Sequence, residues 1–290
     1  MMDSVQVSVD AGVMTLRMNR ADKKNALTRA MYSRMAQALC EADAERSVRA
    51  VLITGSEQCF TSGNDVADFL QAPPSGMDSP VFQFMQALFE LQKPVIAGVA
   101  GPAVGIGTTL LLHCDLVYVS KDAVLKMPFV NLGLCPEFGS SLILPRLLGP
   151  ARASELLLLG ESFSGEQAAQ WGIASAALES GAAALAKAAS AAQRFTQLAP
   201  SAVADSKRLM RTPGREELRQ AIEAEGDLFI QRLRSPEALE ALSAFMQRRQ
   251  PDFSRFNLSK RDYRRGASAG AVLSTAGRCR LRSARRVPSS

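Results

Sequence analysis

One carboxylate stands out in the sequence because its neighbours are almost all apolar or small. Glu137 lies between Pro136 and Phe138 in the run PFVNLGLCPEFGSSLILPRLLG, residues 128–149. A buried carboxylate can take a proton from a reacting carbon and later return it. The same local pattern also fits an exposed acid in a first helical turn, where the helix dipole favours negative charge. The local sequence leaves both interpretations open.

Two glycine-containing turns could supply the complementary chemistry. They are FTSGND, residues 60–65, and GPAVGIG, residues 101–107, and each is placed where a predicted strand gives way to a predicted helix. The first N–H groups of a helix have no partner within it, and the helix dipole adds positive potential there. Two such turns facing one another would form an oxyanion hole. The alternative is that the glycines only end strands tightly.

Several other chemistries find no support in the sequence. It contains no G-x-S-x-G elbow, no G-x-x-x-x-G-K-[ST] phosphate loop and no G-x-G-x-x-G after a strand. The five cysteines include no C-x-x-C pair, and there is a single histidine, His113. We therefore expect neither a metal site nor a disulfide framework, and we expect His113 to be structural.

The elements that must position these residues alternate between strands and helices. Alternation in residues 5–19 predicts a β-hairpin around Ala11 and Gly12, and Thr28 is a good N-cap for the helix that follows. Two buried strands, VRAVLITG and KPVIAGVAG, and an apolar helix, VGIGTTLLLHCD, come next. This order predicts an α/β architecture with parallel strands. The loop 71–80 and the helix 81–91 are expected to shape a substrate pocket.

Composition divides the chain into three parts. Residues 1–200 are the predicted α/β core, residues 201–258 read as an all-helical region, and residues 259–290 form a basic tail that we expect to be disordered. The tail holds nine of the 34 Lys and Arg residues but only one of the 28 Asp and Glu residues. The net charge of +6 therefore belongs to the tail, and nucleic-acid binding is not expected of the protein.

Two features of the sequence bear on the location of the protein. No apolar run reaches the roughly 18 residues that a membrane helix needs, and the first residues do not resemble a signal peptide. No membrane association is therefore expected. The chain ends in VPSS and not in the peroxisomal S-K-L, which favours a cytoplasmic, bacterial-type location and leaves peroxisome and mitochondrion open.

Five segments, in order, resemble motifs of the enoyl-CoA hydratase/isomerase, or crotonase, superfamily. The resemblance runs from about Val5 to Phe253. It implies a spiral of strand-strand-helix units, with C-terminal helices that mediate assembly into a homotrimer or a dimer of trimers. It also implies an acyl-CoA thioester substrate and no separate cofactor, since coenzyme A is part of the substrate. The segments are NRADKKNAL, LITGSEQCFTSGNDV, KPVIAGVAGPAVGIGTTLLLHCDLVYVSKDAVLKMPFVNLGLCPEFGSS, LLLLGESFSGEQAAQWGIAS and FMQRRQPDF.

The same resemblance implies a set of site residues. The backbone N–H groups of Ser62 and Ile106 would hold the thioester oxygen, and Lys24 and Ala26 would lie by the CoA nucleotide. Removing one donor from an oxyanion hole commonly raises the barrier by about 2.7–4 kcal/mol. The remaining substrate-binding positions implied are Gly63, Asn64, Asp65, Val66, Gly105 and Phe129.

The resemblance also separates two reactions. Family members that hydrate 2-enoyl thioesters efficiently use two glutamates, whose positions fall at Thr109 and Phe129 here, and neither residue can act as a general base. The sequence looks more like the delta-3,delta-2-enoyl-CoA isomerase branch, in which Glu137 would be the catalytic acid and base. Burial should then raise its pKa. Weak hydration, another reaction on a CoA thioester, and a binding protein that uses the basic tail are the alternatives. Asp65 and Asp115 are expected to be structural, although Asp65 also belongs to the implied substrate-binding set.

Overall fold

The computed structural model describes residues 3–257. The chain divides into two units, Met1–Pro251 and Asp252–Ser290, and all the elements below belong to the first. The predicted basic tail, residues 259–290, lies outside the described residues. Within the described range, none of the helices is long and apolar enough to cross a membrane.

The main sheet has six strands in the order β1-β2-β3-β4-β6-β9. β1 and β2 form an antiparallel hairpin whose turn residues, Ala11 and Gly12, have φ values of 43° and 83°. Positive φ at both central residues matches the twist of the flanking strands, and the predicted hairpin is confirmed. Every other neighbouring pair in this sheet is parallel, as predicted. The strands are Val5–Asp10, Val13–Met18, Ala50–Thr54, Val95–Val99, Leu116–Ser120 and Ala176–Leu178.

A smaller sheet joins β5 (Pro102–Val104), β7 (Val124–Lys126) and β8 (Ser162–Ser164). The chain follows β4 with β5 and α4, and it follows β6 with β7, the 3₁₀ helix η3 (Val130–Leu132) and α5 (Ser140–Leu148). In both cases a strand of the main sheet is succeeded by a strand of the small sheet and then by helix. This repeated order gives the strand-strand-helix units that the sequence predicts. β5, and the glycines after it, therefore follow directly on β4, an inner strand of the main sheet.

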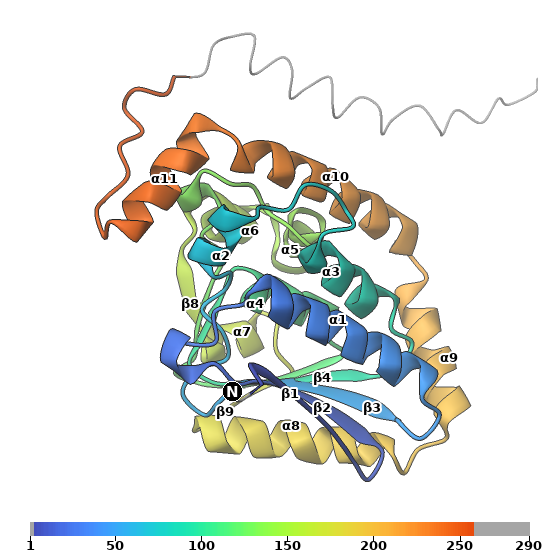
Figure 1. Cartoon of the computed structure of the whole chain (residues 1–290). Helices are drawn as coiled ribbons and strands as arrows, with labels where there is room; N and C mark the ends of the chain where they lie inside the picture. The colour runs from blue at the N-terminus through green and yellow to red at the C-terminus, as the bar shows by residue number, and fades with distance from the viewer. Residues whose placement is uncertain (1–2, 258–290) are drawn as a thin grey trace, which may run out of the picture. The chain divides into compact units, whose positions relative to one another are not determined.

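Helices cover both faces of the main sheet. Figure 1 shows α8 (Gly181–Phe195) along one face, with α1 (Arg29–Ala44) and α3 (Pro80–Glu90) on the other. Thr28 caps α1 as predicted, since its hydroxyl accepts a 3.3 Å hydrogen bond from the Met31 N–H. On α8, small side chains allow a close approach to the strands. The packed residues are Ala188, Ala191 and Ala192 against Val13, Ala50, Leu52 and Ile96.

The structure corrects the single apolar helix predicted for residues 104–115. A four-residue helix, α4 (Ile106–Thr109), passes into a 3₁₀ turn, η2 (Leu110–His113). The Cys114 N–H then donates to the Leu111 carbonyl at 3.2 Å, which closes the tighter turn just before β6 begins. A 3₁₀ turn satisfies the last carbonyl groups within fewer residues than an α-helix would need.

The remaining helices complete the first unit. The helical region predicted from residue 201 corresponds to α9, α10 and α11, and it belongs to the same compact unit as the sheets. The bounds are η1 Ala21–Lys23, α2 Val66–Gln71, η3 Val130–Leu132, α5 Ser140–Leu148, α6 Pro150–Ser154, η4 Glu155–Leu159, α7 Gly165–Gln170, α9 Pro200–Arg211, α10 Arg215–Leu233 and α11 Pro236–Met246.

Asp115 fastens α9 to the main sheet. Its carboxylate accepts 2.8 Å hydrogen bonds from the Val95 N–H at the start of β4, from the Lys207 ammonium and from the Arg211 guanidinium. Lys207 is nearly buried and also donates to the Lys93 carbonyl at 2.6 Å. The structural role predicted for Asp115 is therefore confirmed.

Candidate active site

The two glycine-containing turns lie side by side, as the oxyanion-hole hypothesis requires. Thr61 pairs with Ala103 of β5 in a parallel bridge. The Thr61 N–H donates to the Pro102 carbonyl at 3.0 Å, and the Val104 N–H donates back to the Thr61 carbonyl at 3.0 Å. A Cβ on Gly63 would lie 2.9 Å from the Val104 carbonyl oxygen, so the close approach of the turns depends on a glycine there.

The structure corrects one of the two predicted oxyanion donors. The Ser62 N–H already donates to the Lys24 carbonyl at 3.0 Å, and its neighbours at 63 and 65 are also paired. By contrast, the N–H groups of Asn64 and Ile106 have no hydrogen-bond partner among the described residues. Ile106 is the first residue of α4, where such an unpaired donor is expected. The donor pair available to a ligand is therefore Asn64 and Ile106.

Both unpaired N–H groups belong to residues that line a cavity of about 420 Å³. Seven of the predicted site residues line this cavity, namely Ser62, Gly63, Asn64, Val66, Gly105, Ile106 and Phe129. No residue of the loop 71–80 or the helix 81–91 lines this cavity. Residues of both segments, Met77, Phe82, Met85, Gln86 and Phe89, line a separate cavity of about 180 Å³, so their part in a substrate pocket stays a prediction. The wall opposite the turns comes instead from α10 and α11, with α2 beside them.

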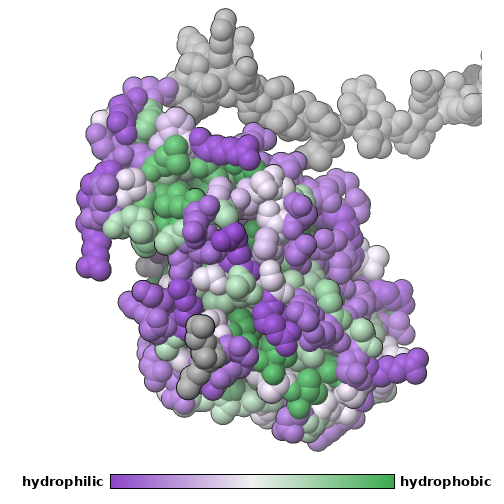
Figure 2. All heavy atoms as spheres, in the orientation of Figure 1, coloured by the Kyte–Doolittle hydropathy of each residue, from purple (hydrophilic) through white to green (hydrophobic). Residues whose placement is uncertain are grey.

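Aromatic rings form much of the apolar wall. Phe229 of α10 meets Phe69 of α2 edge to face with ring centroids 6.3 Å apart, and it meets Phe129 in the same way at 6.5 Å. Leu242 and Phe245 of α11 complete this side. Figure 2 shows hydrophobic residues gathered where Figure 1 draws α2 and α11. The sequence patterns identified these C-terminal helices but did not connect them with the site.

Glu137 is buried, with 4% of its surface exposed, which excludes the exposed helix-end interpretation. One carboxylate oxygen accepts a hydrogen bond from the Thr109 hydroxyl. Desolvation raises the pKa of Glu137 to about 8, against the opposing effect of the Thr109 hydrogen bond and with a smaller upward contribution from the charge of Glu225. The predicted direction of the pKa shift is therefore confirmed.

Glu137 is connected to the cavity through the short helix α4. Among the described residues, the cavity wall includes Ile106 and Leu134 but not Glu137 itself. Thr109, which holds the carboxylate, lies three residues after Ile106 in α4. The short helix α4 therefore carries one unpaired donor of the cavity wall and the hydrogen-bond donor of the buried acid.

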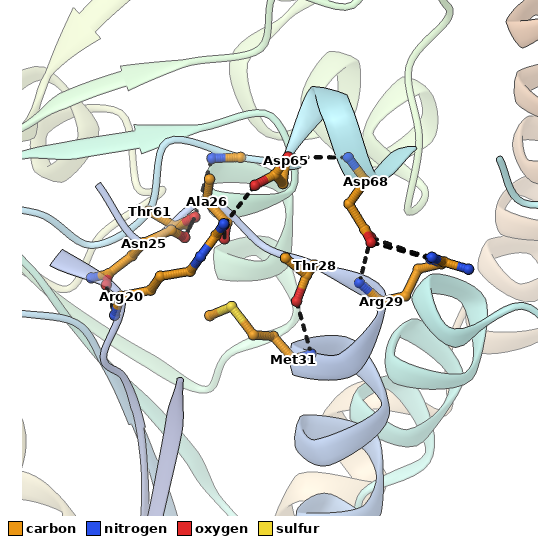
Figure 3. A network of polar contacts seen from close by, with 10 residues as sticks. Arg20, Asn25, Ala26, Thr28, Arg29, Met31, Thr61, Asp65 and Asp68 are labelled. Atoms are coloured by element: carbon orange, nitrogen blue, oxygen red, sulfur yellow. Dashed lines mark hydrogen bonds and ion pairs between the residues drawn. The ribbon is translucent and has the colours of Figure 1, made fainter. Parts of the chain in front are cut away.

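Three of the predicted substrate-binding residues lie outside the cavity wall, namely Lys24, Ala26 and Asp65. Asp65 faces Arg20 (Figure 3) and forms an ion pair with it at 2.6 Å, while the same guanidinium donates to the Ala26 carbonyl at 2.9 Å. Asp65 also caps α2 through the Asp68 N–H. Desolvation opposes ionisation of Asp65, but the Arg20 hydrogen bond and the capped N–H hold its pKa below the ordinary value. Contact of Lys24 and Ala26 with a CoA nucleotide stays a prediction.

Tyr32 is a site residue that the sequence patterns did not identify. It lies in α1, is 2% exposed, and its hydroxyl donates to the Asn64 side-chain oxygen at 2.5 Å. Burial raises the pKa of Tyr32 well above its usual value, and the charge of Glu137 adds to the shift. Tyr32 therefore stays protonated as a donor that orients Asn64.

The site thus combines two unpaired backbone donors, an apolar cavity and a buried acid, an arrangement that can stabilise a developing oxyanion. The chain belongs to the Enoyl-CoA hydratase/isomerase family, whose sequence model matches residues 8–256. It is an enzyme of this family, which acts on acyl-CoA thioesters. The predicted superfamily is thus confirmed.

Known relatives include isomerases with similar sequences. The 1,2-epoxyphenylacetyl-CoA isomerase of Escherichia coli is 38% identical over 180 residues, covering 60% of this chain and 69% of the relative. Human enoyl-CoA delta isomerase 2 is 32% identical over 262 residues, covering 85% of this chain and 64% of the relative. The solved structure of Pseudomonas aeruginosa OdaA is 68% identical with a TM-score of 0.83, covering 84% of this chain and 99% of that one.

Proposed function

We propose that the protein is an enoyl-CoA isomerase that moves a carbon-carbon double bond from position 3 to position 2 of an enoyl-CoA thioester. The observation that carries the proposal is the buried Glu137, whose pKa is raised to about 8 and whose carboxylate is held by the helix that also bears Ile106. A general acid and base works best when its pKa lies near the working pH.

The reaction needs one group that transfers a proton in both directions. In the first step, the ionised Glu137 takes a proton from carbon 2, and the electron pair moves into a dienolate whose thioester oxygen becomes negative. The N–H groups of Asn64 and Ile106 donate to this oxygen. In the second step, the protonated Glu137 gives its proton to carbon 4, and the double bond settles between carbons 2 and 3. The reaction so written requires no separate cofactor.

Hydration is the weaker alternative because it requires a second acid to hold the attacking water. The two positions at which a hydratase would carry glutamates are Thr109 and Phe129. The other buried glutamate, Glu225, accepts hydrogen bonds from the Gly139 and Ser141 N–H groups at 2.5 and 2.9 Å. Its carboxylate is thus directed at backbone groups, which supports the single-base reaction.

A second candidate is isomerisation of a ring-derived acyl-CoA at the same site. The three phenylalanine rings of the cavity wall, Phe69, Phe129 and Phe229, offer edges and faces to an aromatic or cyclic acyl group. The Escherichia coli relative is itself named for an aryl acyl-CoA substrate. Comparing a straight-chain and a ring-bearing 3-enoyl thioester as substrates decides between the two.

We also propose a homotrimer or a dimer of trimers, on the family resemblance, and a cytoplasmic location, which the bacterial relatives support. Exposed apolar side chains at Leu147, Leu158 and Leu159 give subunits a surface to bury. Light scattering of the purified full chain measures the mass of the assembly. A monomer at micromolar concentration would contradict the proposed assembly.

The direct test presents 3-enoyl-CoA and 2-enoyl-CoA thioesters side by side. We expect the 3-enoyl substrate to yield the conjugated 2-enoyl product, while the 2-enoyl substrate gains little water. Glu137→Gln should abolish turnover and leave acyl-CoA binding intact, whereas Glu161→Gln, at an exposed turn, is the matched control. Near-normal turnover by Glu137→Gln, or faster hydration than isomerisation by the unmodified protein, would contradict the proposal.

A further inference from the structure

The residue after Glu137 has an unfavourable backbone conformation. Phe138 has a φ of 56°, in the left-handed region that bulky side chains rarely adopt, and Gly139 follows with a φ of 74°. Together they form a sharp turn between Glu137 and the first residue of α5, Ser140. A strained residue of this kind persists only where its surroundings hold it in place, and such residues cluster at active sites.

His113 holds this turn from the side of α4 and η2. It is 1% exposed, its Nε2 lies 2.7 Å from the Phe138 carbonyl oxygen, and its ring stacks on the Phe138 ring with centroids 3.6 Å apart and planes 12° apart. A carbonyl oxygen can only accept, so Nε2 carries the proton. Burial lowers the pKa of His113 to about 3, which keeps the ring neutral and Nδ1 without a proton.

The other ring nitrogen shows that packing alone does not explain this histidine. Within the described residues, His113 Nδ1 is buried and has no hydrogen-bond partner. An unpaired buried acceptor is unfavourable, so a phenylalanine would suit the same stacked position better if stacking were its only role. The Nε2 donor to the Phe138 carbonyl is the contact that only the histidine supplies.

Glu225 holds the same turn from the opposite side. It projects from α10, which Figure 1 shows passing beside α5, and it is 8% exposed. Its two carboxylate oxygens accept from the Gly139 N–H at 2.5 Å and the Ser141 N–H at 2.9 Å. The N-cap residue Gly139 has no side chain of its own for this purpose, so Glu225 caps α5 from another helix.

We propose that His113 and Glu225 form a two-sided clamp on the turn Phe138–Gly139 and thereby act as positioning residues for the Glu137 carboxylate. This inference rests on the proposed function of Glu137. His113 fixes the carbonyl of the turn and Glu225 fixes its N–H groups, while the Ser140 hydroxyl donates to the Glu137 carbonyl at 2.7 Å. The clamp keeps the carboxylate beside α4 although the residue that follows it is strained.

Variants that remove one contact at a time test the clamp. His113→Phe keeps the stacked ring and loses the donor, His113→Gln restores a donor, and Glu225→Gln leaves one acceptor oxygen in place of two. The matched control is Glu90→Gln, which breaks the ion pairs of α3 with Arg215 and Arg219 on α10 but does not touch the turn. All four retain the size of the original side chain or nearly so.

The measurements are kcat and KM for the 3-enoyl-CoA on the pH plateau, and Kd for a saturated acyl-CoA. We expect His113→Phe and Glu225→Gln to lower kcat by about tenfold or more, because small displacements of a catalytic group cost rate steeply. KM and Kd should stay within about twofold of their values in the unmodified protein, because a change confined to the geometry of the reacting groups lowers kcat without weakening substrate binding. His113→Gln should recover part of the kcat that His113→Phe loses. Glu90→Gln should keep the kcat of the unmodified protein, even if its melting temperature falls as far as that of the clamp variants.

Three results would overturn the clamp. The first is an unchanged kcat in both His113→Phe and Glu225→Gln when both are folded. The second is a kcat for His113→Gln no higher than for His113→Phe. The third is a loss of kcat in Glu90→Gln equal to that in Glu225→Gln. Glu137→Gln measured alongside separates this outcome from failure of the proposed function. If Glu137→Gln is inactive and the clamp variants are fully active, only the clamp is wrong, whereas an active Glu137→Gln refutes the proposed function itself.

Discussion

The hydroxyl of Thr109 offers a sensitive test of how the buried acid is tuned. It donates to the Glu137 carboxylate and lowers the pKa of that group, but desolvation outweighs it, and the pKa with the hydrogen bond in place is about 8. Thr109→Val removes the donor while keeping the shape of the side chain. A hydrogen bond to a charged group contributes about 1.5–3 kcal/mol, and 1.36 kcal/mol corresponds to one pKa unit, so the pKa should rise by about one unit or more.

The rise in the pKa of Glu137 in Thr109→Val should appear in the pH dependence of kcat/KM. A base with a pKa near 8 is about 10% ionised at pH 7, and one with a pKa near 9 only about 1%, so Thr109→Val should lose about tenfold at pH 7. Toward pH 9.5 the two proteins should converge, because the base is largely ionised in both. Thr109→Ser keeps the donor and is the matched control.

The pH dependence of the loss in Thr109→Val distinguishes a pKa effect from a packing effect. If Thr109→Val lowers kcat/KM by the same factor at every pH, the residue contributes packing or geometry and not a shift of the pKa. An acidic limb that lies near pH 4.5 in the unmodified protein would refute the larger argument, because it would mean that Glu137 titrates as an exposed acid or is not the base.

Three further predictions follow from contacts described above. Replacing the peptide nitrogen of residue 64 by an ester oxygen should lower kcat/KM by about 10²–10³, as for other oxyanion donors, whereas the same change at Ser62 should act mainly on stability; equal rate losses would favour Ser62 as the donor. Lys207→Met leaves the Asp115 carboxylate, which attaches α9 to the main sheet, with one cation fewer. It should lower the free energy of unfolding by about 3 kcal/mol in denaturant titrations. A change below the error of the titration would contradict the role given to the ion pair of Lys207 with Asp115. Because the folded pKa of Glu137, about 8, lies above its ordinary 4.5, its protonation stabilises the folded state, and this stability is lost as pH rises through that range. Glu137→Gln should therefore gain stability over the unmodified protein between pH 4.5 and 8, by up to about 5 kcal/mol, and a constant difference across that range would contradict the burial argument.

The parts of the fold that the sequence predicted correctly depend on local patterns. The turn at Ala11 and Gly12, the cap at Thr28 and the buried parallel strands each follow from a few neighbouring residues. The helix after Gly105 was predicted too long because its end is set by the tight entry into β6 and not by a visible stop signal. Nothing within residues 104–115 marks the change to a 3₁₀ turn.

The parts of the site that were missed depend on partners far away along the chain. Ser62 and Asn64 are equally plausible donors in the sequence, and only the carbonyl of Lys24 decides that the first is already paired. Phe229 reaches the cavity from α10, about 100 residues after Phe129, and no periodicity in either segment indicates the meeting. The burial of Glu137 was predicted correctly because the family motif, and not the local pattern, pointed to it.

Ile106 and Thr109 lie within one four-residue helix, so the two steps of the proposed reaction depend on the position of the same element. A substitution that shifts α4 moves two donors together, namely the Ile106 N–H, the proposed donor to the thioester oxygen, and the Thr109 hydroxyl, which donates to the Glu137 carboxylate. Mutations around this helix should therefore show strong epistasis, with combined effects that differ from the product of the separate ones. A changed acyl preference would be acquired more readily through α10 and α11, whose side chains line the same cavity without carrying either group.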